Sequence, residues 1–191
     1  MHNKLTGLFF GSFNPVHIGH LLIANYFVEF TEMCEVWFIV SPQSPFKQKQ
    51  HMLPERQRLH LLNLAIESDD RFRASDIEFS MPKPSYTIDT LTYLSEKHPD
   101  RQFAIIMGSD NLTGFAKWKN YNEILRNYRI YVYPRKNTGT GVIHENIVLT
   151  EAPAVEISSS FIRDAIASNR DIRHYLPAPV WEYISAMNFF R

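Results

Sequence analysis

Short apolar runs alternate with longer amphipathic segments along the chain. The continuous apolar runs are typical of buried strands, whereas the longer segments repeat apolar residues at helical spacing. We predict strands at residues 5–10, 35–40, 72–79, 103–107 and 129–133. We predict helices at residues 21–30, after Pro54, and at residues 86–98 with Ser85 as N-cap, then two or three helices in 158–191 with Pro177 and Pro179 between them.

This order of elements predicts an α/β fold. Continuous apolar strands separated by helices point to a doubly wound parallel sheet with helices on both faces, followed by a C-terminal helical segment at about 158–191. The sequence contains no repeat and no linker, so we expect residues 1–191 to form a single domain. Ligands bind beyond the carboxyl ends of such strands, where Gly11, Ser41 and Gly108 lie.

Composition and charge exclude several classes of partner. Twenty basic residues balance twenty acidic ones, so no overall field favours a nucleic acid or an anionic membrane. The single cysteine, Cys34, has no partner for an intrachain disulfide and suits a reducing compartment. No apolar stretch approaches a membrane span or a signal-peptide core, so we expect a cytoplasmic protein. The sequence leaves the oligomeric state open, a homo-oligomer included.

The first candidate site is the segment GSFNPVHIGH at residues 11–20, between the first strand and the first helix. Backbone N–H groups and a helix dipole at such a junction bind phosphate. Gly11 and Gly19 lack a Cβ, so phosphate oxygens can approach the main chain closely. His17 and His20 are three residues apart, and both imidazoles can face one ligand. A junction with accidental histidines is the alternative, and the complete string argues against it.

The second candidate site is the segment ISSSFIR at residues 157–163. Ser158, Ser159 and Ser160 can cap a helix and still offer hydroxyl or N–H groups to an anion. Arg163 lies one turn further, where its guanidinium can bind the same phosphates. Alone, the segment is typical of a helix cap with a solvated arginine; together with the histidine pair it indicates a phosphate site. Walker and dinucleotide glycine motifs are absent from the sequence.

Together the two motifs resemble the HxGH nucleotidyltransferase superfamily, whose members share a Rossmann-like adenylate-binding domain. The resemblance implies a single nucleotidyltransferase domain over residues 1–191, with His17, His20 and Arg163 as catalytic residues. The chain lacks the second lysine-rich signature of the class I aminoacyl-tRNA synthetases and the RTxGIS segment of the cytidylyltransferases. The implied ATP-binding residues are Gly11, Ser12, Phe13, His17, Gly19, His20, Ser158, Ser159, Ser160 and Arg163.

Within the superfamily, the chain resembles the bacterial nicotinate-nucleotide adenylyltransferases along nearly its full length. The resemblance is carried by SPQSPFK at 41–47, SYTIDTL at 85–91, GSDN at 108–111, Trp118 and Arg135. It implies that Thr87 and Trp118 bind the pyridine ring and its carboxylate, and that Arg135 helps to hold the acceptor phosphate. Asp110 would lie between nucleotide and acceptor, close to Mg²⁺. Lys47 is either a phosphate contact or a solvated side chain.

Two positions depart from the pattern of that family. Asn14 stands where many members have Asp, and Ser160 stands where many have Thr. Both residues preserve size and hydrogen bonding, so we expect activity to be kept. Trp118 also has a physical reason to bind a pyridinium, because Trp offers the best aromatic face for a cation. Packing of an amphipathic surface Trp at a helix end is the alternative.

The implied reaction is transfer of the adenylyl group of ATP, with Mg²⁺, to nicotinate mononucleotide, in NAD biosynthesis. The acceptor phosphate would attack the α-phosphorus in line, without a covalent intermediate, and expel pyrophosphate. The same reaction on nicotinamide mononucleotide, and a non-catalytic nucleotide sensor, remain alternatives. RNA binding around Trp118 is disfavoured by the neutral charge. The remaining histidines that we considered lie in no motif and receive no role: His60, His98, His144 and His174.

Overall fold

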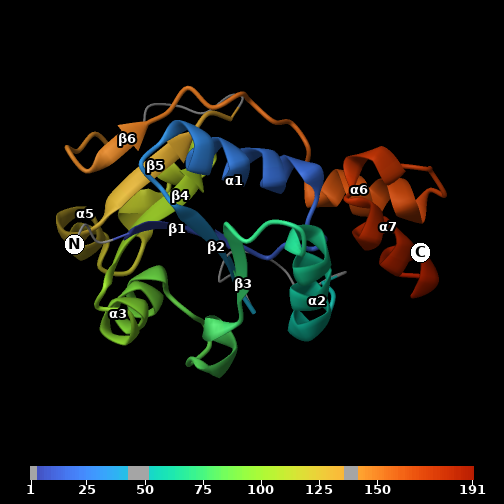
Figure 1. Ribbon diagram of the computed structural model, residues 1–191, viewed down its shortest axis with the longest axis horizontal. Coiled ribbons are helices and arrows are strands. Elements are labelled where there is room, and N and C mark those ends of the chain that lie inside the picture. The colour runs from blue at the N-terminus through green and yellow to red at the C-terminus, as the bar shows by residue number, and fades with distance from the viewer. Residues whose placement is uncertain (1–3, 43–51, 136–141) are drawn as a thin grey trace.

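A parallel β-sheet runs through the centre of the computed structural model, which describes residues 4–42, 52–135 and 142–191 (Figure 1). Its strands pair in the order β3-β2-β1-β4-β5-β6, and every pairing is parallel. This order is the one of the doubly wound nucleotide-binding folds, so the predicted sheet is confirmed. The strands are β1 (Lys4–Gly11), β2 (Glu35–Val40), β3 (Phe72–Ser75), β4 (Arg101–Gly108), β5 (Arg129–Tyr133) and β6 (Ile147–Leu149).

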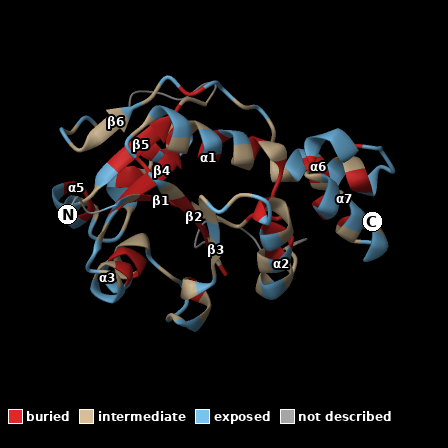
Figure 2. Ribbon diagram, in the orientation of Figure 1, coloured by how far each residue is buried: buried red, intermediate tan, exposed pale blue. Residues whose placement is uncertain are grey.

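Helices cover both faces of the sheet, as the continuous apolar strands predict. Alternate strand residues point to opposite faces, so Phe9 and Phe38 join one buried cluster while Leu8 and Ile39 join the other. Buried residues concentrate in the central strands of the sheet (Figure 2). The first cluster is covered by α1 (Ile18–Phe30), α2 (Glu55–Ile66), α6 (Ser159–Ala167) and α7 (Ala178–Ala186). The second is covered by α3 (Thr87–Lys97), α4 (Ser109–Leu112) and α5 (Tyr121–Asn127). No helix in these ranges is both long and apolar enough to cross a membrane.

The predicted strand at residues 72–79 is only half right. The strand ends at Ser75, and the chain then turns into a 3-10 helix at Ile77–Ser80. This turn directs Glu78 inward, where its carboxylate accepts hydrogen bonds from Ser85 Oγ at 2.8 Å and Thr90 Oγ1 at 2.9 Å. Helix α3 begins at Thr87, so its N-cap is Tyr86, which makes no side-chain cap, and the prediction of Ser85 as N-cap is wrong by one residue.

Several helix and strand limits also differ from the sequence prediction. Helix α1 begins at Ile18 rather than Leu21, and the short elements α4, α5 and β6 were not predicted. Pro177 is the N-cap residue of α7, and Pro179 lies inside its first turn rather than between helices. A proline is tolerated there because the first-turn N–H groups have no partner within the helix. The helical C-terminal segment itself is confirmed by α6 and α7.

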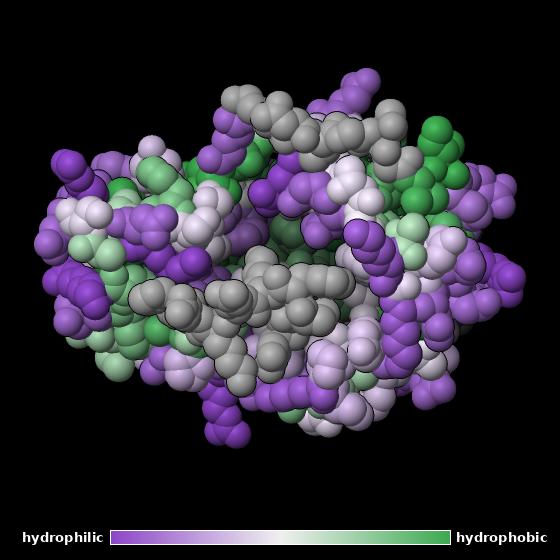
Figure 3. Space-filling model, turned by 180° about the vertical axis from the view of Figure 1, so that it is seen from behind, coloured by the Kyte–Doolittle hydropathy of each residue, from purple (hydrophilic) through white to green (hydrophobic). Residues whose placement is uncertain are grey.

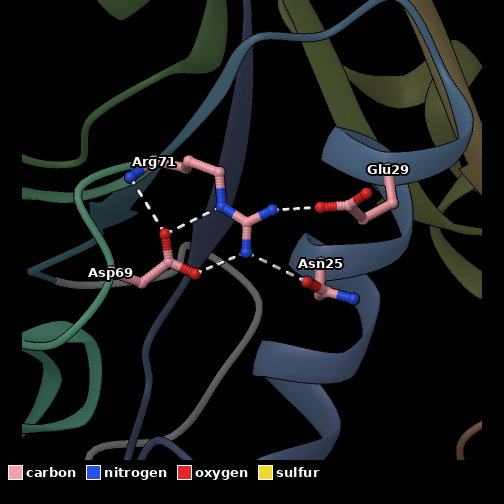
Figure 4. A network of polar contacts seen from close by, with 4 residues as sticks. All are labelled: Asn25, Glu29, Asp69 and Arg71. Atoms are coloured by element: carbon pink, nitrogen blue, oxygen red, sulfur yellow. Dashed lines mark hydrogen bonds and ion pairs between the residues drawn. The ribbon is translucent and has the colours of Figure 1, made fainter.

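A surface network attaches the start of β3 to α1 (Figure 4). The Arg71 guanidinium donates to both carboxylate oxygens of Asp69, at 2.9 and 2.7 Å, and also contacts Glu29 and Asn25 of α1. These hydrogen bonds hold the pKa of the Asp69 carboxyl below its usual range. Solvent screens such pairs, so the network orients β3 more than it stabilises the fold.

The point where the sheet reverses its winding lies between β1 and β4. From β1 the chain continues into α1 on one face, and from β4 it continues into α4 on the other. Gly11 and Gly108 end these two neighbouring strands, so a crevice between the two loops forms at this edge. Seen from the side opposite that of Figure 1, the surface is hollowed near its centre, with hydrophobic residues deep in the hollow and hydrophilic ones above it (Figure 3).

Candidate active site

The loop from β1 to α1 is shaped by one buried aromatic ring. Phe13 has a backbone φ of 45° and is 1% exposed, and its ring lies edge-on to Phe9 and Phe38. A Cβ on Gly11 would lie 2.8 Å from this ring. A Cβ on Gly19 would lie 2.9 Å from Val155 Cγ1 and 3.0 Å from the His17 ring. Close packing therefore favours glycine at both positions, in addition to the close approach of phosphate that we predicted from the sequence.

The two histidines of the loop form one unit. Their rings stack with centroids 3.7 Å apart, and the main-chain N–H of His17 donates to His20 Nδ1 at 3.2 Å. His17 is 3% exposed. Burial, helped by the positive charge of Arg135, lowers the pKa of His17 to about 3. His17 is therefore uncharged near neutral pH, and its buried Nδ1 has no hydrogen-bond partner in the described part of the chain.

The N-terminus of α6 docks on this loop and joins the two sequence motifs. Ser158 caps α6, accepting a hydrogen bond from the Phe161 N–H at 3.1 Å. Ser159 Oγ donates to the Pro15 carbonyl at 2.9 Å, and Arg163 Nη1 donates to the Asn14 carbonyl at 2.8 Å. Motifs about 140 residues apart in sequence thus meet beside the carboxyl end of β1, as we expected.

Asp110 and Arg135 lie together at the ends of β4 and β5. Arg135 Nε is 3.7 Å from Asp110 Oδ1, and the main-chain N–H of Arg135 donates to Ser109 Oγ at 2.8 Å. The two residues line a cavity of about 410 Å³ with residues 154–158, which lead into α6. Gly108 allows this arrangement, because a Cβ there would lie 2.4 Å from Asp110 Oδ1. Arg135 therefore faces the same cavity as Ser158.

A second group of predicted residues gathers at the start of α3. Thr87 is the first residue of α3, and Trp118 follows a 3-10 helix at Phe115–Lys117. Lys119 joins the two segments through an ion pair with Asp89 at 2.9 Å. Trp118 is half-buried and packs on Phe115 with ring centroids 5.2 Å apart, so part of its surface serves the core. The predicted contact Lys47 lies outside the described residues.

Two buried charged residues beside the site were not anticipated. Arg58 of α2 is 1% exposed, and Glu78 before α3 is 2% exposed. The signal for Arg58 is its position on the face of α2 that also carries Leu61 and Leu62. A charged residue on an apolar helix face is buried only when hydrogen bonds satisfy it, so such a position indicates a structured polar network.

The family model and the similar proteins that we compared agree on one family. The model of the cytidylyltransferase-like family matches residues 8–165, which include both motifs. A Flavobacterium psychrophilum protein named "probable nicotinate-nucleotide adenylyltransferase" is 49% identical, over 97% of this chain and 98% of that protein. A Bacteroides thetaiotaomicron protein of the same name is 48% identical, over 95% and 92%.

A solved structure shares the fold at lower sequence identity. The nicotinic acid mononucleotide adenylyltransferase of Plasmodium falciparum, complexed with NaAD, is 19% identical and has a TM-score of 0.82 over 98% of this chain and 97% of that one. This likeness extends over the sheet and the helices that build the candidate site. The chain belongs to the nicotinate-nucleotide adenylyltransferases, within the cytidylyltransferase-like family.

Proposed function

We propose that the protein transfers the adenylyl group of ATP to nicotinate mononucleotide, giving nicotinate adenine dinucleotide and pyrophosphate, as a step of NAD biosynthesis. The observation that carries the proposal is the docking of α6 on the β1–α1 loop through Ser159 and Arg163. This contact unites both phosphate-binding motifs in a chain that is 49% identical to a named relative of this activity. We propose that residues 1–191 act as one nucleotidyltransferase domain.

The triphosphate of ATP would lie between two helix N-termini. Main-chain N–H groups at the start of α1 and α6 provide partial positive charge, and α1 is long enough for a substantial dipole. His17 would act as a neutral hydrogen-bond donor, because burial keeps it uncharged. The proposed nucleotide-binding residues are Gly11, Ser12, Phe13, His17, Gly19, His20, Ser158, Ser159, Ser160 and Arg163, of which His17, His20 and Arg163 are catalytic.

The acceptor would bind beside the start of α3. Thr87 and Trp118 belong to segments that the Lys119–Asp89 ion pair holds together. The aromatic face of Trp118 suits the positively charged pyridinium ring of the acceptor. Arg135 would hold phosphate where nucleotide and acceptor meet, since it lines the cavity that also includes Ser158. Lys47 completes the proposed acceptor set from the sequence alone.

The proposed chemistry requires positioning and charge neutralisation, and no general base. The acceptor phosphate is already an anion and attacks the α-phosphorus of ATP in line, while pyrophosphate leaves. The residues of the described ranges contain no group of three or more His, Cys, Asp or Glu side chains that could hold a metal. Mg²⁺ would enter as the complex with ATP, held mainly by phosphate oxygens, with the Asp110 carboxylate beside it.

Pyrophosphate release from ATP and Mg²⁺ tests the proposal, with nicotinate mononucleotide and nicotinamide mononucleotide assayed in parallel. We expect rapid release with the nicotinate form and much slower release with the amide. Equal rates would keep the reaction and remove the acceptor assignment. No release with either acceptor would contradict the proposal in favour of a nucleotide sensor, and the His20→Ala variant serves as the background control.

A further inference from the structure

A buried arginine lies directly behind the nucleotide loop. Arg58, on α2, is 1% exposed and is among the largest fully buried side chains in the described residues. Burying a guanidinium costs free energy unless hydrogen bonds satisfy its N–H groups. The hydrogen-bond partners of Arg58 therefore indicate its role. Burial lowers the pKa of Arg58, but a guanidinium remains charged at physiological pH.

Within the described residues, Arg58 donates four hydrogen bonds, and all of them end on main-chain carbonyls. Nη1 donates to the Ser12 carbonyl at 2.5 Å and to the Ser41 carbonyl at 2.9 Å. Nη2 donates to Pro42 at 3.3 Å, and Nε donates to Leu53 at 3.0 Å. These carbonyls belong to the loops after β1 and β2 and to the chain entering α2. One side chain therefore fixes the backbone of three segments at the carboxyl edge of the sheet.

The hydrogen bond to Ser12 determines the orientation of a peptide group in the nucleotide loop. In a planar trans peptide the C=O and the following N–H point in opposite directions, so the Phe13 N–H is directed away from Arg58. Phe13 has a φ of 45°, a conformation that costs free energy for a non-glycine residue and persists only when its surroundings hold it. Arg58 supplies one such restraint.

The same loop is held from a second side. Arg163 donates to the Asn14 carbonyl at 2.8 Å, and the Leu53 N–H donates to Asn14 Oδ1 at 3.1 Å. Two arginines from different helices thus bind alternate carbonyls, at Ser12 and Asn14. Of these two carbonyls, only that of Ser12 is followed by an N–H, because the residue after Asn14 is Pro15, which has none. An N–H directed out of a loop in this way is what anion-binding loops present to their ligands.

We propose that Arg58 is a positioning residue for the nucleotide: it orients the peptide group after Ser12 so that the β1–α1 loop binds the polyphosphate chain. The inference rests on the proposed function for the identity of the nucleotide, but its physical content is affinity for a polyphosphate. Arg58 itself is buried behind the loop and contacts no substrate. Its loss should therefore weaken the binding of ATP and of pyrophosphate.

The Arg58→Lys variant tests the proposal, since it keeps the charge but cannot reach carbonyls on several sides with one ammonium group. Arg56→Lys, an exposed position on the same helix, is the matched control. We expect the pyrophosphate dissociation constant, measured by calorimetry, and the KM for ATP to rise about tenfold or more in Arg58→Lys. We expect no change in Arg56→Lys.

A purely structural role predicts a different result. Lost stability alone would reduce the fraction of active molecules, and so the apparent kcat, while the remaining molecules kept normal affinity for pyrophosphate. Folded Arg58→Lys protein with unchanged pyrophosphate affinity would overturn the proposal. Pyrophosphate binding needs no acceptor, so this outcome is distinct from a failure of the proposed reaction, which would appear as absent turnover in the wild-type protein.

Discussion

The imidazole rings of His17 and His20 stack face to face, with centroids 3.7 Å apart and 25° between the ring planes. Two charged imidazolium rings at this separation would repel each other, so the pair cannot hold two positive charges without cost. Burial and the positive charge of Arg135 lower the pKa of His17 to about 3, so this ring is uncharged near neutral pH. His20 Nδ1 accepts a hydrogen bond from the main-chain N–H of His17, so in a neutral His20 the proton lies on Nε2, which can donate. We expect the pair to act by donating hydrogen bonds.

Protein stability should depend on pH through His17. Its folded pKa of about 3 lies below the unfolded value of 6.5, so below pH 6.5 the unfolded chain binds a proton that the folded protein excludes. The contribution to stability is fully present above pH 6.5 and is lost as the pH falls toward 3. We expect this effect to reduce the unfolding free energy by about 2 kcal/mol between pH 7 and pH 5.

Urea unfolding of the wild type and His17→Gln at a series of pH values isolates this effect, because the variant lacks the titrating group. The difference between their unfolding free energies should shrink as the pH falls. Parallel curves for the two proteins would show that His17 titrates alike in the folded and unfolded states.

The His20→Ala variant should lose activity and keep its fold. His20 is only half-buried, and its removal takes away a donor to the phosphates in the proposed mechanism. We expect kcat to fall roughly 10²–10³-fold, as is usual when one such donor is lost. Steady-state kinetics with a thermal unfolding curve test this, and His174→Ala, at an exposed position without a role, is the control. Near-normal kcat in His20→Ala would remove His20 from the catalytic set.

The serines at the start of α6 should contribute unequally to stability. The Ser158 hydroxyl accepts the Phe161 N–H and caps the helix, whereas Ser160 is exposed and contacts the Ser158 hydroxyl at 3.0 Å. We expect Ser158→Ala to lower the unfolding free energy by about 1 kcal/mol. Ser160→Ala should change it by no more than about 0.5 kcal/mol. Equal losses in chemical denaturation would argue against the cap.

Gly108→Ala should damage the site without unfolding the sheet. The new Cβ would lie 2.4 Å from Asp110 Oδ1 and 3.1 Å from Arg135 Nε, so both side chains must move. The backbone φ of Gly108 is −75°, which alanine adopts without strain. We expect a fall in kcat of about tenfold or more, since small misplacements of positioning groups are costly. The melting temperature should change little, and normal turnover would show that the positions of these side chains are unimportant.

Glu78→Gln should loosen the segment that leads to Thr87. The Glu78 carboxylate accepts from Ser85 and Thr90, and the amide offers only one oxygen acceptor for these two hydroxyls. We expect a loss of about 1–3 kcal/mol in unfolding free energy, because a buried polar group loses its partner. We also expect a raised KM for the acceptor. Glu96→Gln, on the exposed side of α3, should change neither value.

The sheet could be predicted because its central strands are buried on both faces and are therefore continuously apolar. Residues 103–107, for example, are all buried within β4. Strand β6 could not be predicted in this way, since it has three residues at the sheet edge and its Leu149 is 72% exposed. Helices α4 and α5 are too short for a clear helical period, and tertiary packing determines them.

The candidate site divides into a predictable and an unpredictable part for a physical reason. The histidine pair and Ser158 act through local backbone geometry, so their spacing in the sequence was informative. Arg58 and Glu78 act through partners up to 46 residues away, and local patterns treat such residues as solvated. The closeness of Trp118 to α3 likewise depends on tertiary packing, since Trp118 and Ile88 of α3 lie against the same apolar cluster, which no spacing rule reveals.

The docking of Arg163 on Asn14 also has a consequence for synthesis on the ribosome. The two residues are 149 positions apart, so the nascent loop must wait for α6 to leave the exit tunnel. At about 5–20 residues per second, this wait lasts roughly 7–30 s. During that time the β1–α1 loop lacks the hydrogen bonds from α6. The loop can therefore reach the conformation of the folded protein only after α6 has been synthesised.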